Sequence, residues 1–272
     1  GLSYGPLAVS GYAERFRAPF REQLQAKVSF APWPSDEAAV ARTLAALPHD
    51  WSEIGAVIVE PIQGRAGVRV PPKGFLATLE RISHEHGALL IVDEIFTGLG
   101  RCGSWWHSTE DGAVPDLLCV GKALGGGLPI SACLGKEEVM AAWGTPDEEA
   151  IHTGTFYGDP LGCAAALATL ELIESDGLID AAASRGHAFA DALRSSGASG
   201  ITEVRQAGML LGLQLEEPMQ ALSLARRLLE RGYLVLPAGA EADVLQLAPP
   251  VTLTDAQRDA FIETLVAAME GS

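Results

Sequence analysis

The chain has 272 residues, 48% of them hydrophobic, which is typical of a globular protein with one large domain or two smaller ones. Its formal net charge of −16 argues against a broad basic surface for nucleic acid. No apolar run is long enough to cross a membrane and no signal peptide is visible, so we expect a cytoplasmic protein.

The four cysteines form neither a CxxC motif nor a cluster with zinc-ligand spacing, which predicts no metal site. Cys119, Cys133 and Cys163 have apolar or small neighbours, and we expect them to be buried free thiols rather than structural disulfides.

Short apolar runs alternate with helical segments in the first part of the chain. We expect buried strands at residues 56–60, 88–92 and 116–120, and a helix over 74–86. A further helix is expected from Asp159-Pro160, an N-cap acceptor followed by a first-turn proline, to about residue 174. This alternation predicts an α/β fold with a mostly parallel sheet and helices on both faces.

The pattern changes near residue 200. Strands are expected at 208–215, 233–236 and 244–247. Helices are expected at 219–231 and 254–269, the second opened by the capping box Thr254-x-x-Gln257. We therefore predict a large domain over 1–185 and a smaller α+β domain over 186–272.

Three ionisable residues follow predicted strands directly: Glu60, Asp93 and Lys122. In open α/β sheets, ligands bind at the carboxyl ends of the strands. The sequence therefore predicts that these side chains share one edge of the sheet, where chemistry is expected.

Lys122 lies between Gly121 and a glycine-rich turn, straight after an apolar run. Desolvation lowers the pKa of an amine and makes it a nucleophile towards aldehydes, and the glycines would let a bulky cofactor approach. The alternative is a lysine that faces solvent from a turn. Asp93 could hold the protonated nitrogen of a pyridine ring, or could simply cap the loop that follows it.

Together these segments resemble the class III (ω-aminotransferase) family of pyridoxal-phosphate-dependent aminotransferases. The resemblance extends from residue 1 to about residue 267, and Lys122 follows Asp93 by 29 residues, as is typical of the family. The motifs that carry it are Glu60-Pro61-Ile62-Gln63-Gly64, Ile91-Val92-Asp93-Glu94-Ile95 with Thr97-Gly98-Leu99-Gly100-Arg101, Gly121-Lys122-Ala123-Leu124-Gly125-Gly126-Gly127-Leu128-Pro129, and His152-Thr153-Gly154-Thr155-Phe156 with Pro160-Leu161-Gly162.

The resemblance implies a role for each residue around the cofactor, pyridoxal 5'-phosphate. Lys122 would form the Schiff base and then move the proton between carbon atoms. Asp93 would pair with the pyridine nitrogen, and Ile95 would pack against the face of the ring.

The same resemblance implies that Gln63 and Glu60 lie near cofactor and substrate. Thr155 would bind the cofactor phosphate of the neighbouring subunit, which implies a homodimer with shared active sites. The implied fold is the fold-type I large domain with a smaller C-terminal domain.

The sequence departs from the family in several places. In family members the phosphate-binding turn and the ring-stacking aromatic residue precede the point where this sequence starts, so we expect a fragment, a processed chain or a protein with further residues before Gly1. Gln246 stands where many members have the arginine that binds a substrate carboxylate, and Arg65 stands where a glutamate gates that arginine. We expect Arg65 to bind the carboxylate instead, the alternative being an exposed arginine. Phe96 replaces a polar residue and would make the pocket more apolar.

The leading prediction is transfer of an amino group from an amine or ω-amino acid to a keto acid such as pyruvate or 2-oxoglutarate. An aminomutase or racemase of the same family is an alternative. A truncated, non-catalytic binding subunit is another.

Overall fold

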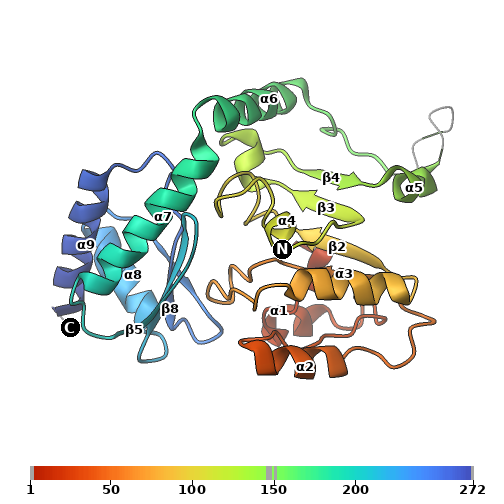
Figure 1. The fold of residues 1–272 in the computed structure, drawn as a ribbon, viewed down its shortest axis with the longest axis horizontal. Helices are drawn as coiled ribbons and strands as arrows, with labels where there is room; N and C mark the ends of the chain where they lie inside the picture. The colour runs from red at the N-terminus through yellow and green to blue at the C-terminus, as the bar shows by residue number, and fades with distance from the viewer. Residues whose placement is uncertain (1–2, 145–148, 150–151, 271–272) are drawn as a thin grey trace.

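The computed structural model describes residues 3–144, 149 and 152–270. Figure 1 shows two units, each built on its own sheet, with the long helix α7 (Leu178–Ser195) running from one towards the other. The domain boundary expected between 185 and 186 falls inside this unbroken helix, and it stays a prediction.

The first sheet has the strand order β1-β2-β3-β4. Strands β1 (Ala56–Val59), β2 (Leu89–Asp93) and β3 (Leu117–Val120) are parallel, which confirms the three expected strands and the α/β class. The sequence did not indicate β4 (Ala132–Gly135), which joins β3 in antiparallel orientation at the edge of the sheet.

Helix α3 (Phe75–Glu85) confirms the helix expected over 74–86. Its buried face, with Phe75, Leu76 and Leu79, packs against β2. The other helices of this unit are α1 (Glu14–Arg17), α2 (Glu37–Ala45), α4 (His107–Glu110), α5 (Glu137–Met140) and α6 (Pro160–Ser175), with 3-10 turns η1 (Pro6–Val9), η2 (Ala18–Phe20), η3 (Lys122–Gly125) and η4 (Ala141–Trp143). The expected start of α6 is confirmed, because Asp159 accepts a hydrogen bond of 2.8 Å from the Gly162 N–H. All four residues of β4 are exposed, so the described chain does not cover both faces of this sheet at its edge.

The second sheet is antiparallel throughout, in the order β5-β6-β8-β7. Its strands are β5 (Ile201–Ala207), β6 (Leu210–Leu215), β7 (Leu236–Ala238) and β8 (Val244–Leu247). The expected strands at 208–215 and 244–247 are confirmed, whereas the one at 233–236 is wrong because β7 begins only at Leu236. Tyr233 and Val235 produced that apolar pattern, and they pack into the core from the loop before β7.

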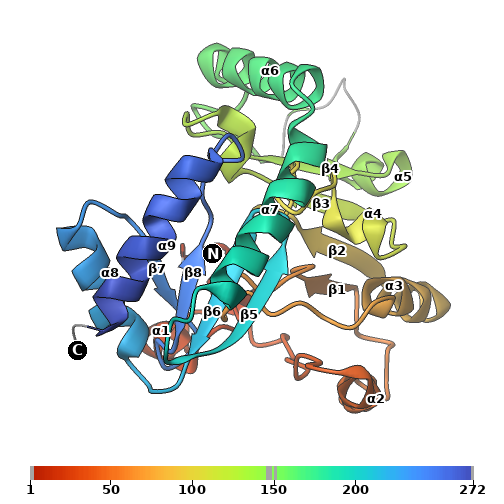
Figure 2. The same cartoon turned by 60° about the vertical axis from the view of Figure 1, so that its left-hand side comes forward.

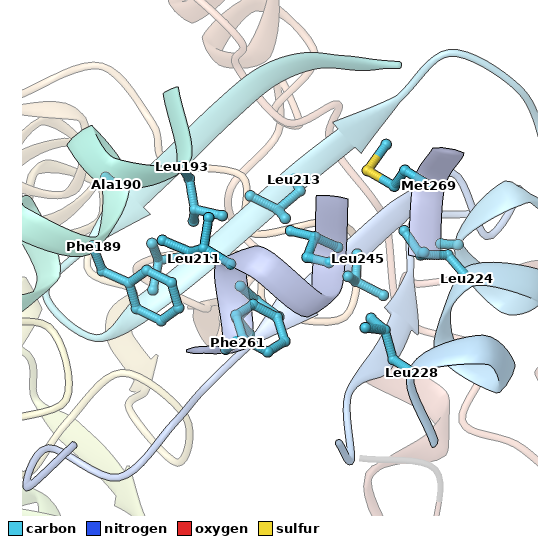
Figure 3. Close-up of a cluster of buried hydrophobic side chains, with 14 of the residues drawn as sticks. Phe189, Ala190, Leu193, Leu211, Leu213, Leu224, Leu228, Leu245, Phe261 and Met269 are labelled. Atoms are coloured by element: carbon cyan, nitrogen blue, oxygen red, sulfur yellow. The ribbon is translucent and has the colours of Figure 1, made fainter. Parts of the chain in front are cut away.

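Helices α7, α8 (Gln220–Glu230) and α9 (Asp255–Glu270) lie against one face of the second sheet (Figure 2). Figure 3 shows their apolar side chains meeting those of β6 and β8, with Leu211, Leu213 and Leu245 at the centre. The predicted capping box is confirmed: the Thr254 N–H donates to Gln257 Oε1 at 3.0 Å, and the Gln257 N–H donates to Thr254 Oγ1 at 3.3 Å.

All four cysteines are free. The expectation of burial is wrong for Cys133, which is exposed because it lies on the edge strand β4, while Cys119 and Cys163 are half-buried. Within the described ranges, no helix has the length and apolar character needed to cross a bilayer.

Candidate functional site

Three ionisable side chains meet at the carboxyl edge of the first sheet. Glu60 follows β1, Asp93 ends β2, and Lys122 comes two residues after β3. Their charges interact, since Lys122 is coupled to both Asp93 and Glu60, and Glu60 is coupled to Asp93. The structure thus brings together the group that the sequence placed at one edge.

Lys122 has an unusual backbone, with φ of 43° in the left-handed region. This region is costly for any residue other than glycine, and such strain is concentrated at functional sites. The conformation begins the 3-10 turn η3 and directs the side chain to Phe96, whose ring centre lies 4.7 Å from Lys122 Nζ. Lys122 therefore lies in a turn and is exposed, as the alternative expected, but its backbone is strained and its amine lies beside Phe96.

The electrostatic surroundings change the protonation of two of the three groups. Burial lowers the pKa of the Lys122 amine, and the charges of Asp93 and Glu60 oppose that shift only in part. Burial also raises the pKa of Glu60, against a hydrogen bond of 3.2 Å from the Gly64 N–H and the positive charge of Lys122. Lys122 is an exposed residue in this chain, and its lowered pKa leaves the amine neutral more often than that of an ordinary surface lysine.

Asp93 also shapes the loop that follows β2. Its Oδ1 accepts a hydrogen bond of 3.0 Å from the Ile95 N–H. Ile95 in turn lies against Gly121, where a Cβ would be only 3.5 Å from the Ile95 side chain. Asp93 therefore caps this loop, and its charge also acts on Lys122, while its expected contact with a pyridine nitrogen stays a prediction.

Glu94 has a structural role that the sequence did not indicate. It is fully buried, and its carboxylate accepts hydrogen bonds from the Thr97 hydroxyl and, at 2.7 Å, from the Ser108 N–H. These bonds tie the loop after β2 to the start of α4. The sequence showed an acidic residue directly after an apolar strand, but not its bond to Ser108, which lies 14 residues further along the chain.

The three residues expected near the substrate gather around Gly64. Residue 64 must be glycine here, because a Cβ would collide with the Phe96 ring. Buried Gln246, which is 3% exposed, donates from Nε2 to the Gly64 carbonyl at 3.4 Å, while its Oε1 has no partner among the described residues. Arg65 is exposed, with its guanidinium 5.7 Å from the ring centre of Tyr12.

Gln63 anchors the same loop. It exchanges two backbone hydrogen bonds of 3.1 Å with Arg69, which closes a tight hairpin between them. Phe96 therefore connects this hairpin to Lys122, since it packs on Gly64 and lies beside the amine.

Thr155 lies on the exposed segment before α6, beside Phe156 and Tyr157, which are 82% and 66% exposed. Its expected contact with the phosphate in a neighbouring subunit stays a prediction.

A separate cleft of about 480 Å³ lies between the Arg69 loop and β5, and Trp33, Arg69 and Arg205 are among its lining residues. It includes none of Glu60, Asp93 or Lys122. We place the candidate chemistry at the sheet edge, because an amine with a lowered pKa lies there beside two carboxylates that follow neighbouring strands. The described residues contain no group of three or more His, Cys, Asp or Glu that could hold a metal ion.

Comparison with known proteins gives relatives along nearly the whole chain. The acetylornithine aminotransferase of Mycobacterium tuberculosis is 38% identical over 276 aligned residues, covering 99% of this chain and 64% of the relative. The chain thus spans somewhat less than two thirds of the length of that curated relative.

Solved structures agree in fold. An aminotransferase of Bacillus anthracis superposes with a TM-score of 0.89 at 24% identity, covering 100% of this chain and 67% of that one. The ornithine aminotransferase of Toxoplasma gondii, described with partial occupancy of pyridoxal phosphate at its active site, gives a TM-score of 0.76 at 31% identity, covering 91% and 58%. The fold is therefore the fold-type I architecture of these enzymes.

The sequence profile of the family described as aminotransferase class-III matches residues 1–269. The match includes both units and all of the motifs around Glu60, Asp93, Lys122 and Thr155. The chain belongs to the class-III aminotransferase family.

Proposed function

We propose that the protein binds pyridoxal 5'-phosphate and transfers an amino group from an amine or ω-amino acid to a keto acid. The observation that carries this proposal is Lys122, which combines strained backbone and a lowered amine pKa with the nearby charges of Asp93 and Glu60 at the carboxyl edge of the parallel strands. Membership of the class-III family supports the same chemistry.

The residues present fit the cofactor. When bound, pyridoxal phosphate supplies an electron sink for reactions at the carbon next to nitrogen. An amine for its aldehyde is available at Lys122, and a carboxylate for its ring nitrogen at Asp93. Ile95 would line the ring face, Gln63 would lie beside the cofactor, and Thr155 of a neighbouring subunit would hold the phosphate.

Lys122 would act as the base and acid that moves a proton on the substrate. Because burial lowers its pKa, a larger share of the amine is neutral near pH 7 than for an exposed lysine. Asp93 would hold a proton on the ring nitrogen, while its bond from Ile95 keeps the carboxylate in place. Glu60, whose pKa is raised by burial, would lie beside the cofactor as a hydrogen-bonding group that ionises less readily than an exposed glutamate.

The substrate pocket would lie around Phe96 and the hairpin of Gln63 and Arg69. Phe96 gives one wall an apolar surface beside the amine. The relatives are named acetylornithine and ornithine aminotransferases, which supports an amino donor with its reacting nitrogen at the end of a carbon chain. Arg65 would bind the carboxylate of the acid substrate, and buried Gln246 would support the hairpin through Gly64.

The cofactor proposal is tested by trapping. After incubation with pyridoxal phosphate and reduction with borohydride, peptide mapping should show the label on Lys122 and not on the chain's other lysines, Lys27, Lys73 and Lys136. Lys122→Ala should lose the label and all transaminase activity, a fall in kcat of more than about a thousandfold.

The matched control is Lys73→Ala, which removes an exposed lysine and should label as the wild type does. Labelling of a different lysine, or none in a folded wild-type protein, would reject the proposal.

The role of Arg65 is tested by kinetics. Arg65→Ala removes a charged hydrogen-bond donor, and we expect KM for the keto acid to rise about tenfold with little change in kcat. Arg81→Ala is the matched control, because Arg81 is also exposed but lies on α3, outside the hairpin, and its removal should leave KM unchanged. Equal KM values for Arg65→Ala and the wild type would show that Arg65 is simply a surface residue.

A further inference from the structure

Two cysteines face each other across the edge of the first sheet. Cys119 of β3 and Cys133 of β4 are direct partners in the antiparallel register. Side chains of opposed residues lie on the same face of a sheet, so both thiols are on one side.

The hydrogen-bond pattern fixes the kind of pair. The Lys136 N–H donates to the Asp116 carbonyl at 3.1 Å, which makes Asp116 and Lys136 a hydrogen-bonded pair. Pairs alternate along an antiparallel ladder, so Cys119 and Cys133, three positions further on, form a non-hydrogen-bonded pair. The Cys119 carbonyl supports this assignment. It accepts a hydrogen bond of 3.0 Å from the Glu94 N–H, on the β2 side of β3, and so points away from β4.

This distinction matters because it sets the distance between the two residues. The Cα atoms of a non-hydrogen-bonded pair are about 4.5 Å apart. Disulfides form over Cα distances of about 4.4–6.8 Å, so the backbone already meets the requirement.

The thiols themselves are in contact and differ in exposure. Burial, the neighbouring Cys133 thiol and the Asp93 charge together raise the pKa of Cys119 to about 11. Cys133 is exposed on β4 and Cys119 is half-buried beneath it. A reagent from solvent would therefore meet Cys133 first and Cys119 second.

The remaining cysteines have no such partner. Cys102 is held in the small cluster with Phe96 and Ala207, where burial raises its pKa strongly, and Cys163 lies on α6. They provide internal controls of the same chemical type.

We propose that Cys119 and Cys133 form a two-thiol modification site that reacts with small organic disulfides and closes into an intramolecular disulfide. The Cys133 thiolate attacks one sulfur of the small disulfide, which releases one small thiolate and leaves a mixed disulfide. The Cys119 thiolate then attacks Cys133 Sγ and releases the second small thiolate. The two protons lost by the cysteines are taken up by the two released thiolates, and the small disulfide is the oxidant.

The cysteine pair lies close to the candidate site at the carboxyl edge of the first sheet. The proposal itself does not depend on the cofactor. Cys119 is the register partner of Asp93 and lies three residues before Lys122. The new bond would fix the edge strand β4 to the strand that carries Lys122.

The test uses the reduced 272-residue chain and oxidised glutathione, with intact mass, thiol titration in denaturant and non-reducing peptide mapping. We expect the four titratable thiols to fall to two, with a mass loss of two hydrogen atoms and one cross-linked peptide pair joining Cys119 to Cys133. Excess dithiothreitol should restore all four.

The variants separate the steps. Cys119→Ser should stop at a stable glutathione adduct on Cys133, and Cys133→Ser should leave Cys119 largely unmodified. Cys163→Ser, the matched control, should close the bond as the wild type does.

Wild-type mapping decides the matter even where a variant fails to fold. A chain with native circular dichroism that forms no bond between Cys119 and Cys133, or pairs either one with another cysteine, overturns the proposal. Because the readout is mass and not cofactor binding, this result is independent of the Lys122 labelling experiment.

Discussion

The two sheets of this chain differ in how their strands are buried. Every residue of β8 is buried and β6 is nearly so, whereas every residue of β4 is exposed and β1 alternates between exposed and half-buried. Both units have an apolar core, but the first sheet leaves its β4 edge exposed in the described chain and carries Glu60, Asp93 and Lys122 at the carboxyl ends of its strands.

Buried polar side chains show the same division. Among the described residues, nearly all of them belong to the first unit, including Glu94 and Asp116, and the second unit contributes Gln246. Even Gln246 points its Nε2 at Gly64 of the first unit. Buried polar side chains therefore fix loops of the first unit by hydrogen bonds, whereas the second unit is held together mainly by apolar contacts.

The largest effect on stability is expected from truncating one leucine in each sheet, because the two sheets differ in how far their strands are buried. Leu213→Ala in β6 removes a fully buried side chain and should lower the free energy of unfolding by about 3 kcal/mol, measured by urea denaturation. The matched change Leu134→Ala in β4, at 48% exposure, should cost about 0.5 kcal/mol or less. Equal costs would mean that β4 is covered in the assembled protein and that the contrast is false.

A second prediction concerns Asp116, which ties the start of the first sheet together. It accepts hydrogen bonds from the Leu90 N–H at 2.7 Å, from Lys136 Nζ at 2.7 Å and from His84 Nε2 at 2.8 Å. Asp116→Asn removes the charge that these donors share and should cost about 2 kcal/mol of unfolding free energy.

The pH dependence of this cost has a definite sign. Burial alone would raise the pKa of Asp116, but the bonds from Lys136, Leu90 and His84 together lower it below 3.8. A lowered pKa stabilises the folded state above the unfolded value, and that stabilisation is lost as the pH falls through the folded value. The difference between wild type and Asp116→Asn should therefore be constant above about pH 5 and shrink below pH 3.8, and a difference independent of pH would contradict it.

The smallest effect is expected at the start of α9. Thr254→Ala removes one half of the capping box and should lower the unfolding free energy by about 1 kcal/mol. Thr252→Ala, an exposed threonine just outside the helix, is the control and should change it by less than about 0.5 kcal/mol. A larger cost at Thr252 would show that the cap is not what stabilises this end of the second unit.

Local pattern alone determined a good part of this molecule. Apolar runs of strand length located β1, β2 and β3, and the polar residue after each run placed Glu60, Asp93 and Lys122 at one edge. Short-range capping chemistry gave the starts of α6 and α9. These features depend on residues within a few positions of one another, which is the range over which a sequence pattern carries information.

Tertiary structure alone decided the rest. The short strand β4 has no alternating pattern, and β5 is interrupted by charged residues, so neither was visible before the sheets paired. The contact of Phe96 with Gly64, the burial of Glu94 and the facing of Cys119 and Cys133 join segments far apart in the chain. Such contacts are set by strand order and register, which are chosen by the packing of the whole fold and not by any one segment.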